Sequence, residues 1–235
     1  MIPMKRLLGV DALERSGTVA NCRMNRERTL TGTNGYSSDL GFHFLSLLEE
    51  KSNGGDQISW LDLCCGSGRA LLEAAQIVGS HGWEAKFKIV GVDLVEAFVR
   101  PDPTVKCLRF VAASLSTWEP DQRFDLVTCV HGLHYIADKL NLIARAVSWL
   151  HDDGRFAANL DLNNCKFVDG RSAGRILAAE FRRNGLLYQP RKKLVTCEGQ
   201  REVKFPFHFL GADDESGPNY TGQPAVDSYY ERSAT

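Results

Sequence analysis

The segment WLDLCCGSGRALLEAA, residues 60–75, decides the fold, because it joins an apolar run to a helical run through a turn of small residues. The apolar run starts at Ile58, and Gly66 and Gly68 follow it before the helix-forming residues begin. Glycine lets the backbone approach a ligand closely, and a helix N-terminus presents unpaired N–H groups to an anion. The segment therefore predicts a ligand site at the carboxyl end of a strand in an open α/β sheet.

Short apolar runs alternate with helical segments along most of the remaining chain. We predict strands at Ile58–Cys65, Phe87–Leu94, Leu108–Ala113, Phe124–His131 and Arg155–Leu162, and helices at about 37–50, 68–78, 139–150 and 173–183. An antiparallel pair, Leu186–Cys197 with Val203–Leu210, is expected to turn through residues 198–200. The expected fold class is α/β: a Rossmann-like, mostly parallel sheet with a late antiparallel strand and helices on both faces.

Three zones divide the chain. Residues 1–57 form an N-terminal lid or helical segment, residues 58–212 form the ligand-binding domain, and residues 213–235 form a tail or flap. The last zone is rich in Gly, Pro, Asp and Ser but also holds tyrosines, so both a disordered tail and an ordered flap are compatible with it.

A second motif places an acidic residue at the same sheet edge as the glycine turn. The run Val90-Gly91-Val92 ends in Asp93, 27 positions after Gly66. An acidic residue at that place can accept both hydroxyl groups of a ribose. A dinucleotide fingerprint would also require a small residue at position 71, where this chain has Leu71, so the sequence disfavours a nicotinamide cofactor.

Composition excludes several classes of protein. The chain has 235 residues, 28 Lys and Arg against 29 Asp and Glu, and a formal net charge of −1, so we expect no nucleic-acid partner. No apolar run is long enough to span a membrane, and the N-terminus has no secretory signal. The seven cysteines form no zinc-binding spacing. We therefore expect a cytoplasmic protein with no membrane association.

Four stretches together resemble class I SAM-dependent methyltransferases, where SAM is S-adenosylmethionine. Residues 61–68 resemble motif I and residues 90–93 resemble motif II of that family. Residues 124–127 resemble the signature of its fourth strand, and residues 153–156 resemble the turn into its fifth. The resemblance covers residues 58–165 and implies SAM as the cofactor.

The resemblance also implies cofactor roles by position. Asp62 and the backbone of Cys64, Gly66 and Gly68 would surround the methionine part of SAM, Asp93 would bind the ribose, and Leu94, Ser114 and Leu115 would flank the adenine. Two positions depart from the family pattern. Many relatives carry Asp near Ser114, and Cys64 stands where the first glycine of motif I is usual.

Two histidines after the fourth strand are candidates for proton transfer. His131 and His134 lie at the expected mouth of the cofactor crevice, and histidine is suited to accept a proton near neutral pH. His131 is also expected to line the methionine end of the cofactor, and His134 to orient the substrate. A structural histidine bonded to a loop carbonyl is the alternative for each. The pair has no third ligand nearby, so no metal site is expected.

Further residues are candidates for acceptor binding. Arg26 or Arg28 could clamp a carboxylate, Tyr36 precedes the first strand, and Tyr135 follows the histidines. Asn163 and Asn164 follow the fifth strand and could hydrogen-bond the substrate, with a plain turn as the alternative, and Tyr220 could form an aromatic wall. The sequence thus predicts a methyltransferase acting on an O or N atom of a small molecule. A methyltransferase for RNA or a peptide, a non-catalytic SAM-binding regulator and an NAD-dependent dehydrogenase are the alternatives.

Overall fold

A seven-stranded sheet with the order β3-β2-β1-β4-β5-β8-β7 forms the centre of the protein. The computed structural model describes residues 6–20, 27–41, 46 and 57–233. The strands of this sheet are β1 (Ile58–Leu63), β2 (Phe87–Asp93), β3 (Leu108–Ala112), β4 (Phe124–Cys129), β5 (Leu150–Asn159), β7 (Leu187–Gln189) and β8 (Leu194–Glu198). All six residues of β1 are buried, as expected for a central strand that is covered on both faces.

Five strands of this sheet run parallel and two follow in an antiparallel pair. The pairs β1–β2, β1–β4, β2–β3 and β4–β5 are parallel, whereas β8 is antiparallel to both β5 and β7. This order confirms the predicted Rossmann-like fold class, including its late antiparallel strand.

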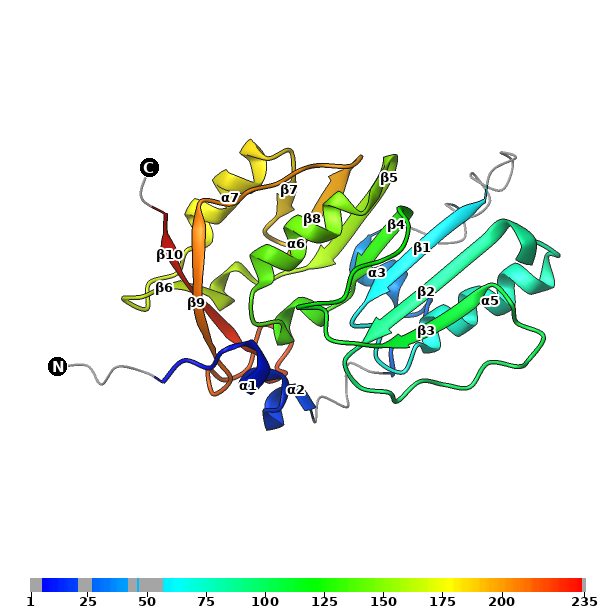
Figure 1. Ribbon diagram of the computed structural model, residues 1–235, viewed down its shortest axis with the longest axis horizontal. Coiled ribbons are helices and arrows are strands. Elements are labelled where there is room, and N and C mark those ends of the chain that lie inside the picture. The colour runs from blue at the N-terminus through cyan, green and yellow to red at the C-terminus, as the bar shows by residue number, and fades with distance from the viewer. Residues whose placement is uncertain (1–5, 21–26, 42–45, 47–56, 234–235) are drawn as a thin grey trace.

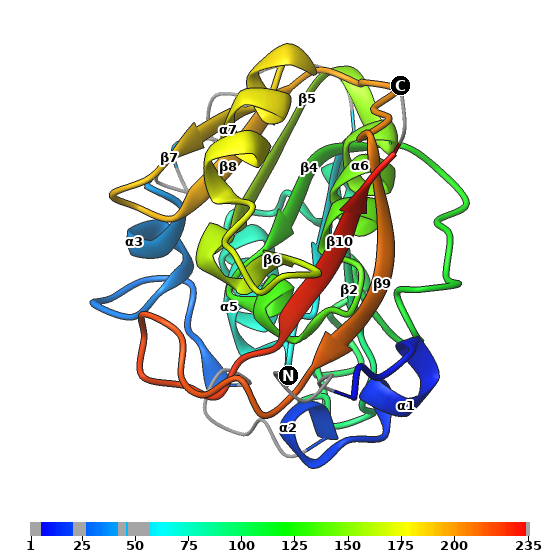
Figure 2. The same cartoon turned by 90° about the vertical axis from the view of Figure 1, so that its left-hand side faces the viewer.

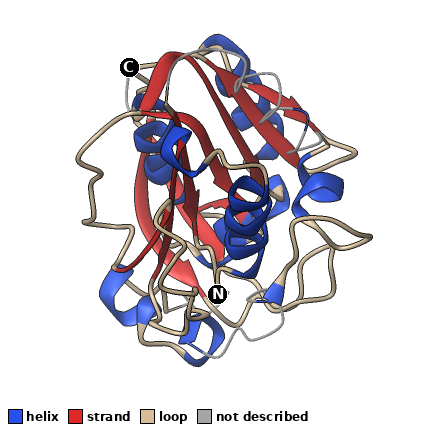
Figure 3. Ribbon diagram, turned by 90° about the vertical axis from the view of Figure 1, so that its right-hand side faces the viewer, coloured by secondary structure: helices blue, strands red, loops and turns tan. Residues whose placement is uncertain are grey.

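Helices cover both faces of the large sheet (Figures 1 and 3). The longer helices are α5 (Arg69–Ser80), α6 (Lys139–Ser148) and α7 (Gly174–Arg183), and the short ones are α1 (Val10–Glu14), α2 (Gly17–Ala20) and α3 (Tyr36–Leu40). The described residues also form the 3-10 turns η2 (Glu84–Lys86) before β2, η3 (Gly132–Tyr135) before α6, and η4 (Leu162–Asn164) between β5 and β6. Helices α5 and α3 bury their apolar side chains in one core cluster, and α6 and α7 bury theirs in the other. Of the helix expected at 37–50, residues 42–45 and 47–50 lie outside the described residues.

The predicted hairpin between Leu186–Cys197 and Val203–Leu210 is wrong. The first of these segments folds back on itself as β7 and β8, because Pro190 lacks an N–H for the ladder and Lys193 adopts a left-handed φ of 50°. The second segment contributes to β9 (Phe207–Asp213), which leaves the large sheet.

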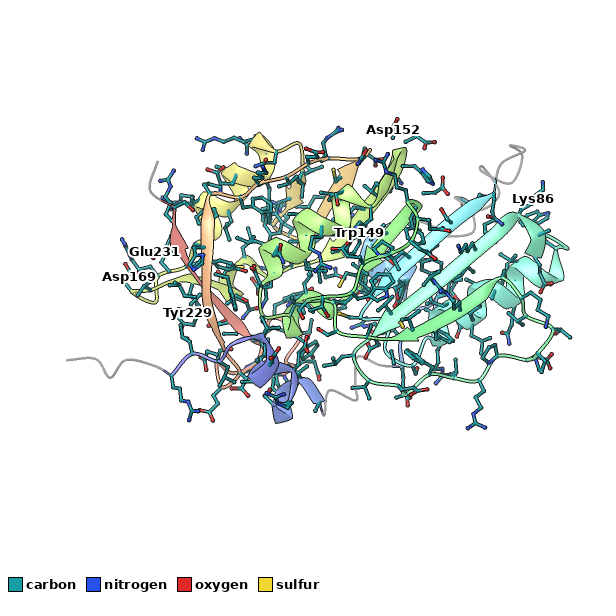
Figure 4. All side chains as sticks on the ribbon, in the orientation of Figure 1. Lys86, Trp149, Asp152, Asp169, Tyr229 and Glu231 are labelled. Atoms are coloured by element: carbon teal, nitrogen blue, oxygen red, sulfur yellow. The ribbon has the colours of Figure 1, made fainter. Side chains whose placement is uncertain are left out.

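A second, three-stranded sheet holds the C-terminal part of the chain (Figure 2). Its order is β6-β10-β9, with β6 (Cys165–Phe167) parallel and β9 antiparallel to β10 (Asp227–Arg232). Two residues of β10, Tyr229 and Glu231, lie at the opposite end of the molecule from Lys86, which precedes β2 (Figure 4). The C-terminal zone is thus an ordered strand and loop over its described residues.

A buried lysine joins the two sheets. Lys139, the first residue of α6, is fully buried, and its Nζ donates to the carbonyls of Ile136 and Val226 at 2.9 Å each and to Ser228 Oγ at 2.7 Å. Three acceptors satisfy all three donors of the ammonium group. The C-terminal strand is therefore anchored beside the loop that follows β4.

Among the described helices, none is long and apolar enough to cross a membrane.

Candidate active site

The turn between β1 and α5 holds three residues in the left-handed region. Cys64, Gly66 and Gly68 have φ values of 56°, 60° and 76°. A Cβ on Gly68 would come within 2.1 Å of Phe110 Cε1, so this position requires glycine for space as well as for conformation. The turn therefore brings the start of α5 directly against β3.

A carboxylate at the end of β2 closes this turn. Asp93 Oδ2 accepts a hydrogen bond of 2.9 Å from the backbone N of Gly66, and Oδ1 accepts one of 3.1 Å from that of Val95. These two backbone donors hold the carboxylate in one orientation. Asp93 is thus fixed in place at the end of β2.

A cavity of about 200 Å³ opens beside Asp93 at the carboxyl ends of the strands. Of the residues that the sequence assigned to the site, six line it: Cys64, Gly66, Asp93, Leu94, Leu115 and Tyr135. Most of the remaining wall is apolar, including Val95, Ala113 and Val130. A mostly apolar cavity with a few fixed polar groups is the usual form of a cofactor site. We call this space the cofactor cavity.

The N-terminal helices α1 and α2 and helix α6 also line the cofactor cavity. Val10 and Glu14 from α1 and Val19 from α2 line one side, and Asp138 together with Asn141 and Arg145 of α6 line another. Ser114 Oγ donates to Glu14 Oε1 at 2.6 Å, which ties the N-terminal helices to the loop after β3. None of these six lining residues was found from the sequence. Asp138, whose side chain caps α6 by accepting from the N of Asn141, was detectable as a helix cap.

Asp62 lies deeper than the cavity wall. Its side chain is fully buried, accepts a hydrogen bond of 2.6 Å from the hydroxyl of Tyr36, and accepts another from Thr128 Oγ1. Burial raises the pKa of Asp62 to about 7, against the lowering effect of these two hydrogen bonds. Tyr36 is itself 5% exposed. The structure therefore engages both residues in an internal contact between α3 and β1, away from the cofactor cavity.

Arg28 is engaged by its own segment. Its guanidinium forms an ion pair with Asp39 of α3 and donates to the carbonyl of Asn34 at 3.2 Å. The alternative residue Arg26 lies outside the described residues. The predicted carboxylate clamp stays a prediction, and in this conformation Arg28 binds a carboxylate of the protein itself.

The two histidines lie side by side behind the cofactor cavity. Their ring centroids are 5.7 Å apart, and the side chain of His131 is 4% exposed while His134 is fully buried. His131 Nε2 lies 3.4 Å from Asp39 Oδ1. Burial lowers the pKa of His134 well below its usual value, and the nearby charges of His131, Lys139 and Arg28 add to this effect. His134 is therefore neutral at pH 7.

The rings of both histidines face Tyr220, in the loop that links β9 to β10. The Tyr220 ring centroid is 6.1 Å from that of His131 and 5.6 Å from that of His134, and its hydroxyl lies 3.5 Å from His131 Nδ1. The backbone neighbour Gly132 lines the cofactor cavity. The histidine pair thus lies against Tyr220 and next in sequence to Gly132, a residue of the cavity wall.

A second pocket lies beyond Tyr220. Six of the residues that line it are Asp161, Asn163 and Asn164 after β5, Lys193 before β8, and Asn219 and Tyr220 in the loop before β10. We call it the polar pocket. It contains three residues that the sequence predicted for acceptor binding, Asn163, Asn164 and Tyr220, and the sequence missed Asn219.

Comparison with known proteins identifies the family. A search of curated proteins finds no match. Among solved structures, the chain is similar to coclaurine N-methyltransferase bound to N-methylheliamine and S-adenosylhomocysteine (SAH), with 16% identity, a TM-score of 0.39, and coverage of 66% of this chain and 45% of that one.

It is also similar to the glycopeptide N-methyltransferase MtfA complexed with SAM, with 20% identity and a TM-score of 0.37. The match covers 51% of this chain and 55% of that one. For SAM-bound CalS10, an amino pentose methyltransferase from Micromonospora echinaspora, the identity is 18% and the TM-score is 0.35. The match covers 49% of this chain and 48% of that one. The chain spans about half the length of these structures. A family model described as a methyltransferase domain matches residues 37–194. The chain therefore belongs to the methyltransferase domain family.

Proposed function

We propose that this protein is a SAM-dependent methyltransferase that moves a methyl group to an O or N atom of a small-molecule acceptor. The observation that carries the proposal is the carboxylate of Asp93, held by two backbone N–H groups at the wall of an apolar cavity where β1 and β2 end. In open α/β folds, nucleotide-like ligands bind beyond the carboxyl ends of the strands, with an acidic residue on the ribose.

The residues present fit such a cofactor. Asp93 would accept the ribose hydroxyls, Leu94 and Leu115 would pack against the adenine, and the turn at Cys64 and Gly66 would hold the methionine part. When bound, SAM supplies a methyl group on a sulfonium, which needs no further activation by the protein. The chain itself must align the acceptor with that methyl group and exclude water.

The histidine pair is the proposed site of proton transfer. A hydroxyl or ammonium acceptor loses a proton on methylation, and a neutral imidazole can take it up. His134 is neutral at pH 7 because burial lowers its pKa, and both of its ring nitrogens have no hydrogen-bond partner among the described residues. The ring of His131 lies 5.7 Å from that of His134, and its Nε2 lies 3.4 Å from Asp39 Oδ1. We propose that His131 receives the proton and that neutral His134 orients the acceptor.

The expectations about partners and location belong to the same proposal. The formal net charge of −1 supports a small acceptor over a nucleic acid. The cofactor cavity of about 200 Å³, with α1 and α2 in its lining, also supports a small acceptor. We propose that the protein acts in the cytoplasm, away from membranes.

Calorimetric titration with SAM, SAH and NAD tests the cofactor. We expect SAM and SAH to bind and NAD not to bind. Asp93→Ala should weaken SAH binding by about 1–3 kcal/mol, because a buried hydrogen-bonded contact is lost. Asp121→Ala, which removes an exposed carboxylate before β4, is the control and should leave the affinity unchanged. Binding of NAD, or an Asp93→Ala variant with unchanged SAH affinity, would contradict the proposal.

A further inference from the structure

Glu14, the last residue of helix α1, places a carboxylate at the wall of the cofactor cavity. The residue lines that cavity and is half-buried, so a ligand can reach it. Its Oε1 accepts a hydrogen bond of 2.6 Å from Ser114 Oγ. The neighbours of Ser114 on both sides, Ala113 and Leu115, also line the cavity. The carboxylate therefore stands beside the part of the cavity that the loop after β3 forms.

Helix α1 is held in place by β9, which lies beside it (Figures 1 and 2). The backbone of Leu8, just before α1, exchanges two hydrogen bonds with Ala212 of β9, at 2.7 and 2.9 Å. The side chain of Leu13 is fully buried in a core cluster that also contains Ala212. These two anchors fix the helix that carries Glu14, so its carboxylate is positioned before a ligand arrives.

The backbone carbonyls of the loop after β3 are already engaged within the protein. The carbonyl of Ser114 accepts from a backbone N–H of the following turn at 2.9 Å. The carbonyls of Leu115 and Ser116 accept from Arg145 Nη1 at 2.6 and 3.2 Å. Within the described residues, by contrast, Ser114 is the one donor to Glu14, and a carboxylate has about four lone-pair sites. Glu14 is therefore the acceptor at this wall with capacity for a ligand.

The hydroxyl protons beside Glu14 are directed toward its carboxylate. Ser114 donates its single hydroxyl proton to Glu14. In the 2.6 Å contact between Ser114 Oγ and Ser116 Oγ, the proton must therefore come from Ser116. Both hydroxyls are used as donors within this chain of contacts, and a carboxylate has no proton to give. These three side chains thus present only hydrogen-bond acceptors to a ligand.

This group of acceptors lies next to the proposed ribose contact. The backbone N of Ala113 donates to the carbonyl of Asp93 at 2.9 Å, so Ser114 directly follows a residue that is bonded to Asp93. The side chain of Leu115 is 5% exposed and forms apolar wall between them. A flat base attached to a ribose at Asp93 can pack on this apolar wall, and its outer edge then meets acceptors alone.

We propose that Glu14 binds the exocyclic amine of the cofactor's adenine and makes the site selective for a 6-amino purine over a 6-oxo purine. The inference rests on the proposed function, with Asp93 on the ribose and Leu115 against the base. An amine that donates to Glu14 forms a charge-assisted hydrogen bond, whereas the oxygen of a 6-oxo purine would face a carboxylate. Helix α1 is thus part of the cofactor site and decides which purine the site accepts.

Binding of SAH and of its 6-oxo analogue, S-inosylhomocysteine, to the full chain tests this inference. The two probes share the ribose and the amino-acid part and differ only in the purine, where an amine is replaced by an oxygen. We expect the wild type to bind SAH at least about tenfold more tightly than the 6-oxo analogue, as measured by calorimetry.

Two matched variants separate contact with the purine from support of the helix. Glu14→Gln keeps an oxygen that can accept from Ser114 and replaces the other by an NH2 group, which can donate to a 6-oxo group. Its preference for SAH should fall to about equal affinity for the two probes. Asp11→Asn makes the same change of an acid to an amide at an exposed position of α1 outside the cavity lining, and should keep the wild-type preference.

Each outcome has a separate meaning. Failure of the wild-type chain to bind SAH contradicts the proposed function itself. Normal SAH binding with the 6-oxo analogue bound as tightly overturns the inference about Glu14 alone. The inference is also overturned if Glu14→Gln shows the same ratio of affinities as Asp11→Asn, even with both probes weakened, because Glu14 would then support α1 without contacting the purine.

Discussion

Replacing Asp62 by Asn should make the protein more stable in mildly alkaline solution. The carboxylate of Asp62 is fully buried, and burial raises its pKa from 3.8 to about 7. A rise of about three pKa units corresponds to about 4 kcal/mol, since each unit is worth about 1.4 kcal/mol. Above pH 7, the ionised carboxylate therefore lowers the free energy of unfolding of the wild type by about that amount.

The sign follows from proton binding in the two states. Below pH 3.8 the carboxyl group is protonated in both the folded and the unfolded chain, so its contribution to stability is full. Between pH 3.8 and about 7 the unfolded chain has released the proton and the folded chain retains it, so stability falls as the pH rises. Above about pH 7 both states are ionised, and the loss is complete.

Asparagine keeps the local hydrogen bonds and removes the charge. Its carbonyl oxygen can accept from Thr128 as Asp62 Oδ1 does, and its NH2 group can donate to the hydroxyl oxygen of Tyr36. Urea unfolding at about pH 5 and about pH 8 measures the effect. The difference in stability between Asp62→Asn and wild type should shift by about 3 kcal/mol in favour of the variant over that interval.

The comparison cancels other titrating groups, because they are present in both proteins. Asp121→Asn, at an exposed carboxylate, is the control and should show the same pH dependence as the wild type. If the stability curves of Asp62→Asn and wild type run parallel between about pH 5 and about pH 8, Asp62 does not carry a raised pKa, and the argument from its burial is refuted.

Two further substitutions test the histidine pair and the glycine turn. As the pH falls below 6.5, the unfolded chain takes up a proton that buried His134 does not, so His134 lowers the stability of the wild type relative to His134→Leu by up to about 1.4 kcal/mol per pH unit. Urea unfolding across this range should show that difference, and parallel stability curves for the two proteins would contradict the burial argument. Gly68→Ala should destabilise the protein by at least about 2 kcal/mol in urea unfolding, because its φ is 76° and the new Cβ would overlap Phe110; a smaller loss would show that the turn can rearrange.

Local patterns in the sequence predicted the Rossmann-like core well. The strands β1 to β4 begin at the predicted residues and end one or two residues early, at Leu63, Asp93, Ala112 and Cys129. These boundaries are readable because each apolar run stops at small or polar residues and is followed by a turn or a helix. The placement of Gly66 and Asp93 at one sheet edge followed directly from this alternation.

Local sequence patterns could not predict which distant residues meet in the walls of the two pockets. Glu14 and Ser114 are 100 positions apart, and His131 and Tyr220 are 89 apart, yet each pair meets at the site. Hydrophobic periodicity shows which face of a helix or strand is buried, but it does not show which other segment packs against that face. The sequence therefore could not predict these contacts. The hairpin error has the same origin, since nothing local to Val203–Leu210 shows that β10 is its neighbour.

Asp62 and Asp93, the acidic residues of the stretches that resemble motifs I and II, show that a motif match does not determine whether a residue reaches the cofactor cavity. In the register of β1 and β2, Asp62 stands opposite Gly91 and Leu63 opposite Val92, so Asp93 extends one position beyond the end of β1. That step brings Asp93 to the cavity wall, while Asp62 stays in the sheet and pairs with Thr128 across from β4. A motif aligns residue types along one strand, whereas access to the cofactor cavity depends on how far that strand runs past its neighbours. Asp93 therefore stands at the cavity wall, whereas Asp62 bonds within the protein and its predicted cofactor role stays a prediction.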